Sequence, residues 1–111
     1  DELVYEAGLK AELEELGYQV LRQQEFPIYY KGKPTEVNRR IDVVVRDEVL
    51  GFVILELMAM EYIYDVQRAQ LWSYMKLLNN KYGMLINFSP KGVYSENWML
   101  GADIKDKCIR V

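Results

Sequence analysis

Apolar residues recur every three or four positions in two parts of the chain, and this period predicts amphipathic helices. The first helix is expected over residues 2–16, with Gly17 as its C-terminal cap. The second is expected over residues 65–79, with Asp65 as its N-cap. Leucines form the expected buried stripe of the first helix: Leu3, Leu9, Leu13 and Leu16.

Runs rich in β-branched and aromatic residues predict strands around these helices. Four runs are clear and the last is weaker: residues 18–30, 37–46, 49–60, 82–88 and 104–111. Pro27 indicates a sheet edge or a bulge in the first of them. The short polar link Asp47-Glu48 predicts that the second and third strands form an antiparallel hairpin. The expected order is therefore helix, three strands, helix, strand and one further edge strand.

Glu56 is the one carboxylate inside the apolar run of residues 49–60, with no other charge within four positions on either side. A buried carboxylate is unfavourable unless it is paired, protonated or bound to a cation. Asp42 has similar apolar surroundings on the preceding strand, so the two carboxylates can converge and hold a divalent ion. The alternative is structural ion pairing, of Asp42 with Arg40 or Arg46 and of Glu56 with an arginine elsewhere.

Composition narrows the chemistry that such a site can perform. The 111 residues are half hydrophobic, which suits one compact domain over residues 1–111. The absence of histidine excludes His-based triads and the usual zinc sites, so a metal would need oxygen ligands, which favours Mg²⁺ or Mn²⁺. One cysteine fits a reducing, cytoplasmic location. The net charge of −3 does not indicate a general polyanion binder, and no apolar stretch is long enough to cross a membrane.

Five blocks of sequence carry a resemblance to a known family. They are Glu2-Leu3-Val4-Tyr5, Arg40-Ile41-Asp42, VILEL over residues 53–57, Ala69-Gln70-Leu71 with Tyr74, and LINF over residues 85–88. In this order they resemble the motifs of the small bacterial proteins called GxxExxY, a family of the PD-(D/E)XK nuclease superfamily. The resemblance runs from Glu2 to about Phe88, and the tail after Phe88 fits it poorly. It implies an α/β (α+β) fold with a restriction-endonuclease-like αβββαβ core, a mixed central sheet flanked by helices, as a single domain.

The same resemblance implies a metal site. Asp42 and Glu56 would hold Mg²⁺ or Mn²⁺, with the backbone carbonyl of Leu57 as a further ligand. Glu2 would reach the site from the first helix through water, and Gln70 would orient the attacking water or a ligand.

Tyr74 lies one turn after Gln70 on the same helical face, which places it at the same site. Each of these residues also has a structural alternative. Glu2 can serve only to stabilise the N-terminus of the first helix, and Gln70 can cap a sheet edge. Tyr74 can be a core residue whose hydroxyl lies at the rim of the core.

Met58 stands where the superfamily has its third signature residue, a lysine. The lysine ammonium helps to orient or deprotonate the attacking water and stabilises negative charge on phosphorus, which a thioether cannot do. Methionine matches lysine in length and lack of branching, so the fold should tolerate it. The resemblance thus implies a divalent-metal-dependent nuclease-like domain for phosphodiester hydrolysis of DNA or RNA, inactive or strongly impaired. Arg40 shares a strand face with Asp42 and is a better replacement cation than Lys76, which lies on a different helical face from Gln70.

Basic residues gather between the first two strands, interleaved with Tyr29 and Tyr30. Candidate nucleic-acid-binding residues are Lys31, Lys33, Arg39 and Arg40. Such a patch can meet a phosphate backbone, and a hairpin tip kept soluble by lysines is the alternative. A second function therefore remains open, a non-catalytic nucleic-acid- or protein-binding or regulatory module on the same fold. An exposed sheet edge would also allow a homodimer.

Overall fold

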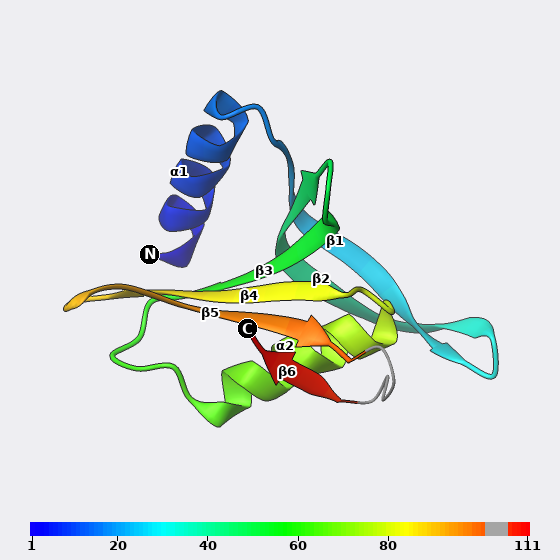
Figure 1. The fold of residues 1–111 in the computed structure, drawn as a ribbon. Coiled ribbons are helices and arrows are strands. Elements are labelled where there is room, and N and C mark those ends of the chain that lie inside the picture. The colour runs from blue at the N-terminus through cyan, green and yellow to red at the C-terminus, as the bar shows by residue number, and fades with distance from the viewer. Residues whose placement is uncertain (102–106) are drawn as a thin grey trace.

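The computed structural model describes residues 1–101 and 107–111, which contain two helices and six strands. In chain order they are α1 (Glu2–Glu15), β1 (Gln19–Tyr30), β2 (Lys33–Asp47), β3 (Gly51–Met58), α2 (Asp65–Leu77), β4 (Tyr82–Ser89), β5 (Gly92–Leu100) and β6 (Cys108–Arg110). The strands form one curled sheet in the order β1 to β6, and α1 and α2 lie on opposite faces of it (Figure 1). The prediction of a mixed sheet flanked by helices is confirmed.

Within the described residues, β3 and β4 are the one parallel pair of neighbouring strands, and all other neighbours are antiparallel. Parallel neighbours need a crossover, and α2 supplies it. The predicted hairpin of β2 and β3 is confirmed by pairs from Val43↔Leu55 to Asp47↔Gly51. Its turn is closed by Asp47, whose Oδ1 accepts the N–H groups of Val49 and Leu50 at 2.8 Å each.

Two apolar clusters hold the helices to the sheet. The cluster under α2 includes Ile54 and Met58 of β3, while the cluster under α1 includes Leu55 and Leu57. Successive residues of a strand point to opposite faces, so Glu56 lies on the α2 side together with Ile54 and Met58. The element that carries the candidate carboxylate is therefore fixed on both faces.

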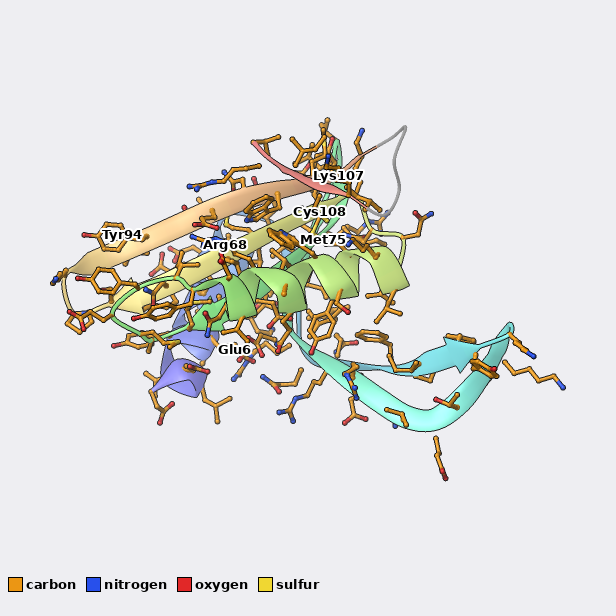
Figure 2. All side chains as sticks on the ribbon, turned by 90° about the horizontal axis from the view of Figure 1, so that it is seen from below. Glu6, Arg68, Met75, Tyr94, Lys107 and Cys108 are labelled. Atoms are coloured by element: carbon orange, nitrogen blue, oxygen red, sulfur yellow. The ribbon has the colours of Figure 1, made fainter. Side chains whose placement is uncertain are left out.

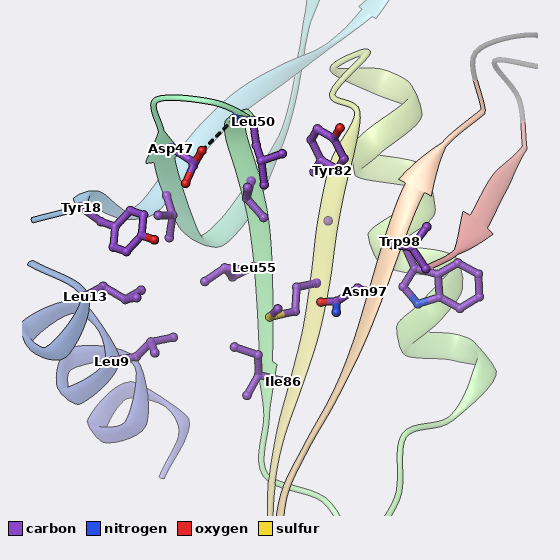
Figure 3. Close-up of a pocket in the computed structure, with 15 residues that line it drawn as sticks. Leu9, Leu13, Tyr18, Asp47, Leu50, Leu55, Tyr82, Ile86, Asn97 and Trp98 are labelled. Carbon is purple, nitrogen blue, oxygen red and sulfur yellow. Dashed lines mark hydrogen bonds between the residues drawn. The ribbon is translucent and has the colours of Figure 1, made fainter. Parts of the chain in front are cut away.

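The predicted leucine stripe of α1 is only partly buried. Leu3 and Leu16 are 59% and 74% exposed, and the one buried residue of this helix is Glu6. Leu9 and Leu13 contact the sheet and line one wall of an apolar cavity of about 590 Å³ between α1 and the sheet (Figure 3). The stripe prediction was wrong at both ends because α1 leans over the sheet through its middle turns.

Three details of the predicted elements need correction. The N-cap of α2 is Tyr64, whose N–H donates to Oε1 of Gln67 at 3.0 Å, and Asp65 is the first helical residue. The strand β5 was not predicted. Of the predicted last strand over residues 104–111, residues 104–106 lie outside the described residues, and Cys108–Arg110 form the edge strand β6.

Among the described residues, no helix is long and apolar enough to cross a membrane.

Candidate metal centre

Asp42 and Glu56 occupy opposite positions on β2 and β3. The last ladder pair of these strands is Val43↔Leu55, so the two carboxylates stand one step beyond it, directly across from each other. Side chains at such positions have Cβ atoms about 4.5–5.5 Å apart. Instead of continuing the ladder, Oδ2 of Asp42 accepts the backbone N–H of Leu57 at 3.0 Å. The Asp42 carboxylate is thereby held against the end of β3.

The other edge of β2 is also irregular at Asp42. Between β1 and β2, the pairs Arg22↔Val43 and Gln24↔Ile41 are formed, but the pair between them, Gln23 with Asp42, is missing. Gln23 has a φ of 52°, in the left-handed region that side chains other than glycine rarely adopt. Asp42 is therefore free of regular pairing on both sides.

The buried carboxylate of Glu6 fixes this irregular point, and it was not among the residues predicted from the sequence. Nε2 of Gln23 donates to both Glu6 oxygens at 2.8 Å, and Nε of Arg22 donates to Oε1 at 3.0 Å. Glu6 is 2% exposed and lies one turn after Glu2. The spacing of Glu2 and Glu6 on one helix face was the one sequence feature that could have pointed to Glu6. The residues that bind Glu6 lie 16 and 17 positions away on β1, so the local pattern does not indicate its burial.

Glu56 is 5% exposed, and its Oε1 atom is buried without a hydrogen-bond partner among the described residues. Burial raises the pKa of Glu56 to about 10, assisted by a hydrogen bond with Asp42 and by repulsion from Asp42 and Glu6. No ion pair in residues 1–101 and 107–111 includes Asp42 or Glu56. The described residues therefore do not form the alternative arrangement, in which arginines would neutralise these two carboxylates.

One cavity of about 260 Å³, called the carboxylate cavity below, brings most of the predicted site residues together. It is lined by Glu2, Asp42, Glu56, Leu57, Met58 and Gln70, among others. Glu56 and Met58 are buried, whereas Glu2 and Gln70 are exposed at the mouth. No three carboxylate, cysteine or histidine side chains of the described residues are grouped closely enough to share one ion. Asp42 and Glu56 are thus the close pair, and Glu2 lies farther out.

Tyr74 lines an adjoining cavity of about 320 Å³, which shares Asp42 and Gln70 with the first and also contains Arg39 and Arg40. Tyr74 is 8% exposed and packs edge-on against Phe26, with ring centres 5.6 Å apart. Burial raises the pKa of its hydroxyl, and the nearby Glu56 raises it further. The two arginines therefore lie beside Asp42 but outside the carboxylate cavity.

Lys31 and Lys33 are not brought to this site. Both are exposed at the tip of the β1–β2 hairpin, which projects beyond the body of the molecule (Figure 1). Lys33 precedes Asp42 by nine positions on β2, which corresponds to roughly 30 Å of extended strand. The predicted basic patch is thus divided into a pair of arginines beside the cavity and a pair of lysines at the tip.

The carboxylate cavity fits a hard divalent cation. Two facing carboxylates, one of them with an unpartnered buried oxygen, are unfavourable alone and become a ligand pair when a cation lies between them. The N–H and C=O of one strand residue point to the same side. The carbonyl of Leu57 therefore faces the Asp42 side, where its N–H already donates. This donor set consists of oxygen atoms, as Mg²⁺ and Mn²⁺ prefer.

Comparison with known proteins identifies the fold family. The sequence profile described as the PD-(D/E)XK nuclease superfamily matches residues 1–98. The chain belongs to this superfamily. The predicted restriction-endonuclease-like fold is confirmed, and divalent metal is the typical cofactor of PD-(D/E)XK nucleases. The match also includes most of β5, so the superfamily pattern extends past Phe88, where the motif blocks ended.

A solved structure described as "Crystal structure of SSO0001" resembles this PD-(D/E)XK chain, with a TM-score of 0.65 and 17% sequence identity. The similarity covers 86% of this chain and 48% of that one, so this chain spans about half the length of that structure. At this identity the similarity shows the shared fold alone. A search of curated proteins finds no match.

Proposed function

We propose that this PD-(D/E)XK chain is a divalent-metal-binding, nuclease-like domain whose phosphodiester hydrolysis of DNA or RNA is lost or strongly impaired. The observation that supports this is the facing pair of the half-buried Asp42 and the buried Glu56, which lines a cavity and has one buried carboxylate oxygen, Oε1 of Glu56, without a partner among the described residues. The motif blocks further favour the bacterial GxxExxY proteins as its family within the superfamily, and the single cysteine favours a cytoplasmic location.

In this proposal each residue of the cavity has one task. Asp42 and Glu56 hold Mg²⁺ or Mn²⁺ together with the Leu57 carbonyl, and the bound ion supplies a Lewis acid and an activated water. Glu2 and Gln70 at the exposed mouth orient water by hydrogen bonds. A scissile phosphate beside Asp42 would also meet Arg39, Arg40 and Tyr74, which line the adjoining cavity: the arginines attract it, and Tyr74 limits the space.

Met58 explains the expected loss of hydrolysis. Its side chain is 4% exposed and lines the carboxylate cavity, and none of the described residues that line this cavity is basic. A developing negative charge on phosphorus therefore has no ammonium beside it. Arg40 in the adjoining cavity is the proposed source of residual activity.

Calorimetric titration of the protein with Mn²⁺ tests the metal site directly. We expect one ion per chain with a dissociation constant in the micromolar to millimolar range. Binding should disappear in Asp42→Asn, which keeps the size of the side chain and the acceptor for the Leu57 N–H. The matched control is Asp47→Asn, an aspartate of the same strand that serves the β2–β3 turn. No binding to the unmodified chain, or equal loss in both variants, would contradict the proposal.

A second candidate function is a non-catalytic nucleic-acid-binding module on the same fold. The projecting hairpin favours it, because Lys31 and Lys33 are exposed beside the exposed rings of Tyr29 and Tyr30. This function predicts binding of DNA or RNA in EDTA, with a steep dependence on salt. Nucleic-acid binding by a chain that binds no Mn²⁺ would favour this candidate over the first, which requires the metal.

A further inference from the structure

We propose that a second cavity, beside the metal centre, binds one unpaired nucleobase of a nucleic-acid strand that reaches the carboxylates. This inference rests on the proposed function, because it assumes that the chain binds nucleic acid. The cavity has a volume of about 330 Å³ and lies between the loop of residues 61–63, α2, β4 and β5. Figure 2 shows Arg68 on α2 and Tyr94 on β5, two of the residues that line it.

Asn87 supplies the hydrogen-bonding group of this cavity. It is 1% exposed, and its Oδ1 accepts the backbone N–H of Met60 at 2.9 Å. Since only the carbonyl oxygen of an amide can accept, this contact fixes the orientation of the side chain and leaves Nδ2 as the donor. Nδ2 is buried and has no partner among the described residues. A ligand with a carbonyl oxygen or a ring nitrogen would satisfy it.

The charges around the cavity are already compensated. Nε of Arg68 donates to Oε1 of Glu96 at 2.7 Å, and Nζ of Lys91 lies 3.6 Å from Oε1 of Glu61. Arg68 also pairs with Asp65 at 2.9 Å. Because the cations that line the cavity have carboxylate partners, the cavity favours a neutral polar group over a phosphate. The ring of a nucleobase has this character.

Tyr62 and Tyr94 offer the flat surfaces that a base needs. They are 52% and 53% exposed, and both line the cavity. Tyr94 is the cross-strand partner of Asn87, so its side chain lies on the same face of the sheet as the amide. A base stacked on either ring would place its polar edge toward Nδ2 of Asn87.

Met60 connects this cavity with the metal centre. Its side chain lines the carboxylate cavity, while its N–H holds Asn87. The segment that follows β3 therefore forms the wall between the two cavities, and neighbouring nucleotides of one strand can occupy them. A base in a duplex is stacked and paired, so only an unpaired or extruded base can reach Asn87. The predicted substrate class is single-stranded or locally opened nucleic acid.

The test uses the whole chain labelled with ¹⁵N, in EDTA so that hydrolysis is prevented. One probe is an oligothymidylate of about ten nucleotides, a length within the usual range for single-strand sites. The other is the same backbone with abasic sugars. The side-chain NH₂ resonances of Asn87 report on the cavity itself, and fluorescence anisotropy gives the affinity. We expect the Asn87 resonances to shift with oligothymidylate only, and the abasic strand to bind more weakly.

Variants of the two tyrosines complete the test. Tyr62→Ala and Tyr94→Ala should each weaken oligothymidylate binding roughly tenfold and leave abasic binding unchanged. Tyr18→Ala is the control, because Tyr18 lines the apolar cavity on the opposite face of the sheet (Figure 3). Equal affinity for both strands with unmoved Asn87 resonances would overturn the base site and leave the proposed function intact. No binding of either strand, together with no binding of Mn²⁺, would overturn both.

Discussion

Two side chains on one face of β3 have opposite consequences for activity. Glu56 and Met58 stand two residues apart, both buried and both facing the carboxylate cavity. In the proposed site the first is a metal ligand, and the second stands where the resemblance implies a lysine cation. If the proposal is right, a single change at position 58 should restore the missing cation to this site.

Met58→Lys should raise the rate of hydrolysis of a nucleic-acid substrate by a factor on the order of 10²–10³, the usual effect of one such electrostatic group. Lysine has similar length and no branch, and its ammonium would lie beside Glu56 on the same strand face. The measurement is cleavage of a panel of single- and double-stranded DNA and RNA in Mn²⁺. Met58→Gln is the control, because it adds polarity without charge. No gain for lysine over glutamine on any substrate would count against a nuclease-like site.

The raised pKa of Glu56 predicts how stability depends on pH without metal. In the folded state the Glu56 carboxyl stays protonated up to its pKa of about 10, whereas in the unfolded chain it loses its proton near the ordinary pKa of 4.5. The folded state therefore binds more protons between these values, and the free energy of unfolding should fall as the pH rises through this window. Urea unfolding in EDTA at several pH values measures this slope.

Glu56→Gln is the matched control for that slope, because its amide stays neutral and the decline that belongs to Glu56 should disappear. Excess Mn²⁺ should oppose the decline in the unmodified chain, since an ion binds the deprotonated pair and gains affinity as the pH rises. Parallel slopes for the unmodified chain and Glu56→Gln would show that Glu56 does not titrate in this way.

Some residues of the site could be predicted from the sequence and others could not, for a physical reason. Asp42 and Glu56 were predicted because a charge inside an apolar run is unusual wherever the strand lies. Glu6 and Asn87 were not, because a polar residue on a helix face or in a short strand is common. Only their distant partners show that they are buried. The partner of Asn87 is Met60, 27 residues away in sequence.

At the scale of elements, the approach of α2 to β4 depends on one glycine. An added Cβ at Gly83 would lie 2.6 Å from Sδ of Met75 and 2.9 Å from Cδ1 of Leu71. Both of these side chains are fully buried, so neither has open space into which to move. The glycine therefore sets the distance between the crossover helix and the parallel strand pair.

Gly83→Ala should lower the free energy of unfolding by about 1–3 kcal/mol, the usual cost of overpacking a core. Gly8→Ala is the control, because an added Cβ there meets nothing within 4 Å and alanine favours the interior of a helix. That variant should be neutral or slightly more stable. Denaturant unfolding of both variants measures the difference. Equal stability of the two would mean that α2 is not tightly packed on β4.

Element prediction succeeded where local pattern and burial agree. The β-branched run of β2 and the apolar runs of β3 and β4 identified strands that are paired on both sides. The failure at β5 has a clear cause. This strand carries Ser95, Glu96 and Asn97 in succession, and the buried Glu96 is compensated chiefly by Arg68 of α2. A pattern within nine residues contains no trace of a partner 28 positions away.

For the whole molecule, the β1–β2 hairpin extends the surface available to a nucleic acid well beyond the cavities. The lysines at its tip should bind phosphates of the backbone independently of the metal. Lys31→Ser combined with Lys33→Ser should reduce the slope of log affinity against log salt, by about 0.9 for each duplex-DNA phosphate that the hairpin no longer neutralises. Binding titrations in EDTA at several salt concentrations measure this slope.

Lys10→Ser is the control for the tip lysines, because Lys10 lies on α1 and pairs with Glu14 at 2.9 Å. It carries the same charge away from the hairpin and should leave the slope unchanged. An unchanged slope in the double variant as well would show that the tip does not bind phosphates.

The edges of the sheet also bear on how the protein behaves at high concentration. An edge strand as long as β1 invites pairing with a second molecule and, from there, aggregation. Here Pro27 lacks an N–H, the ladder shifts register between Pro27 and Tyr29, and Lys31 places a charge at the end. On the opposite side, the described residues of β6 (Cys108–Arg110) pair only with Trp98–Leu100, so the earlier part of β5 is also an open edge. Strand-to-strand association is thus disfavoured at the β1 edge, so a homodimer that joins two sheets would have to pair through the part of β5 that β6 leaves uncovered among the described residues.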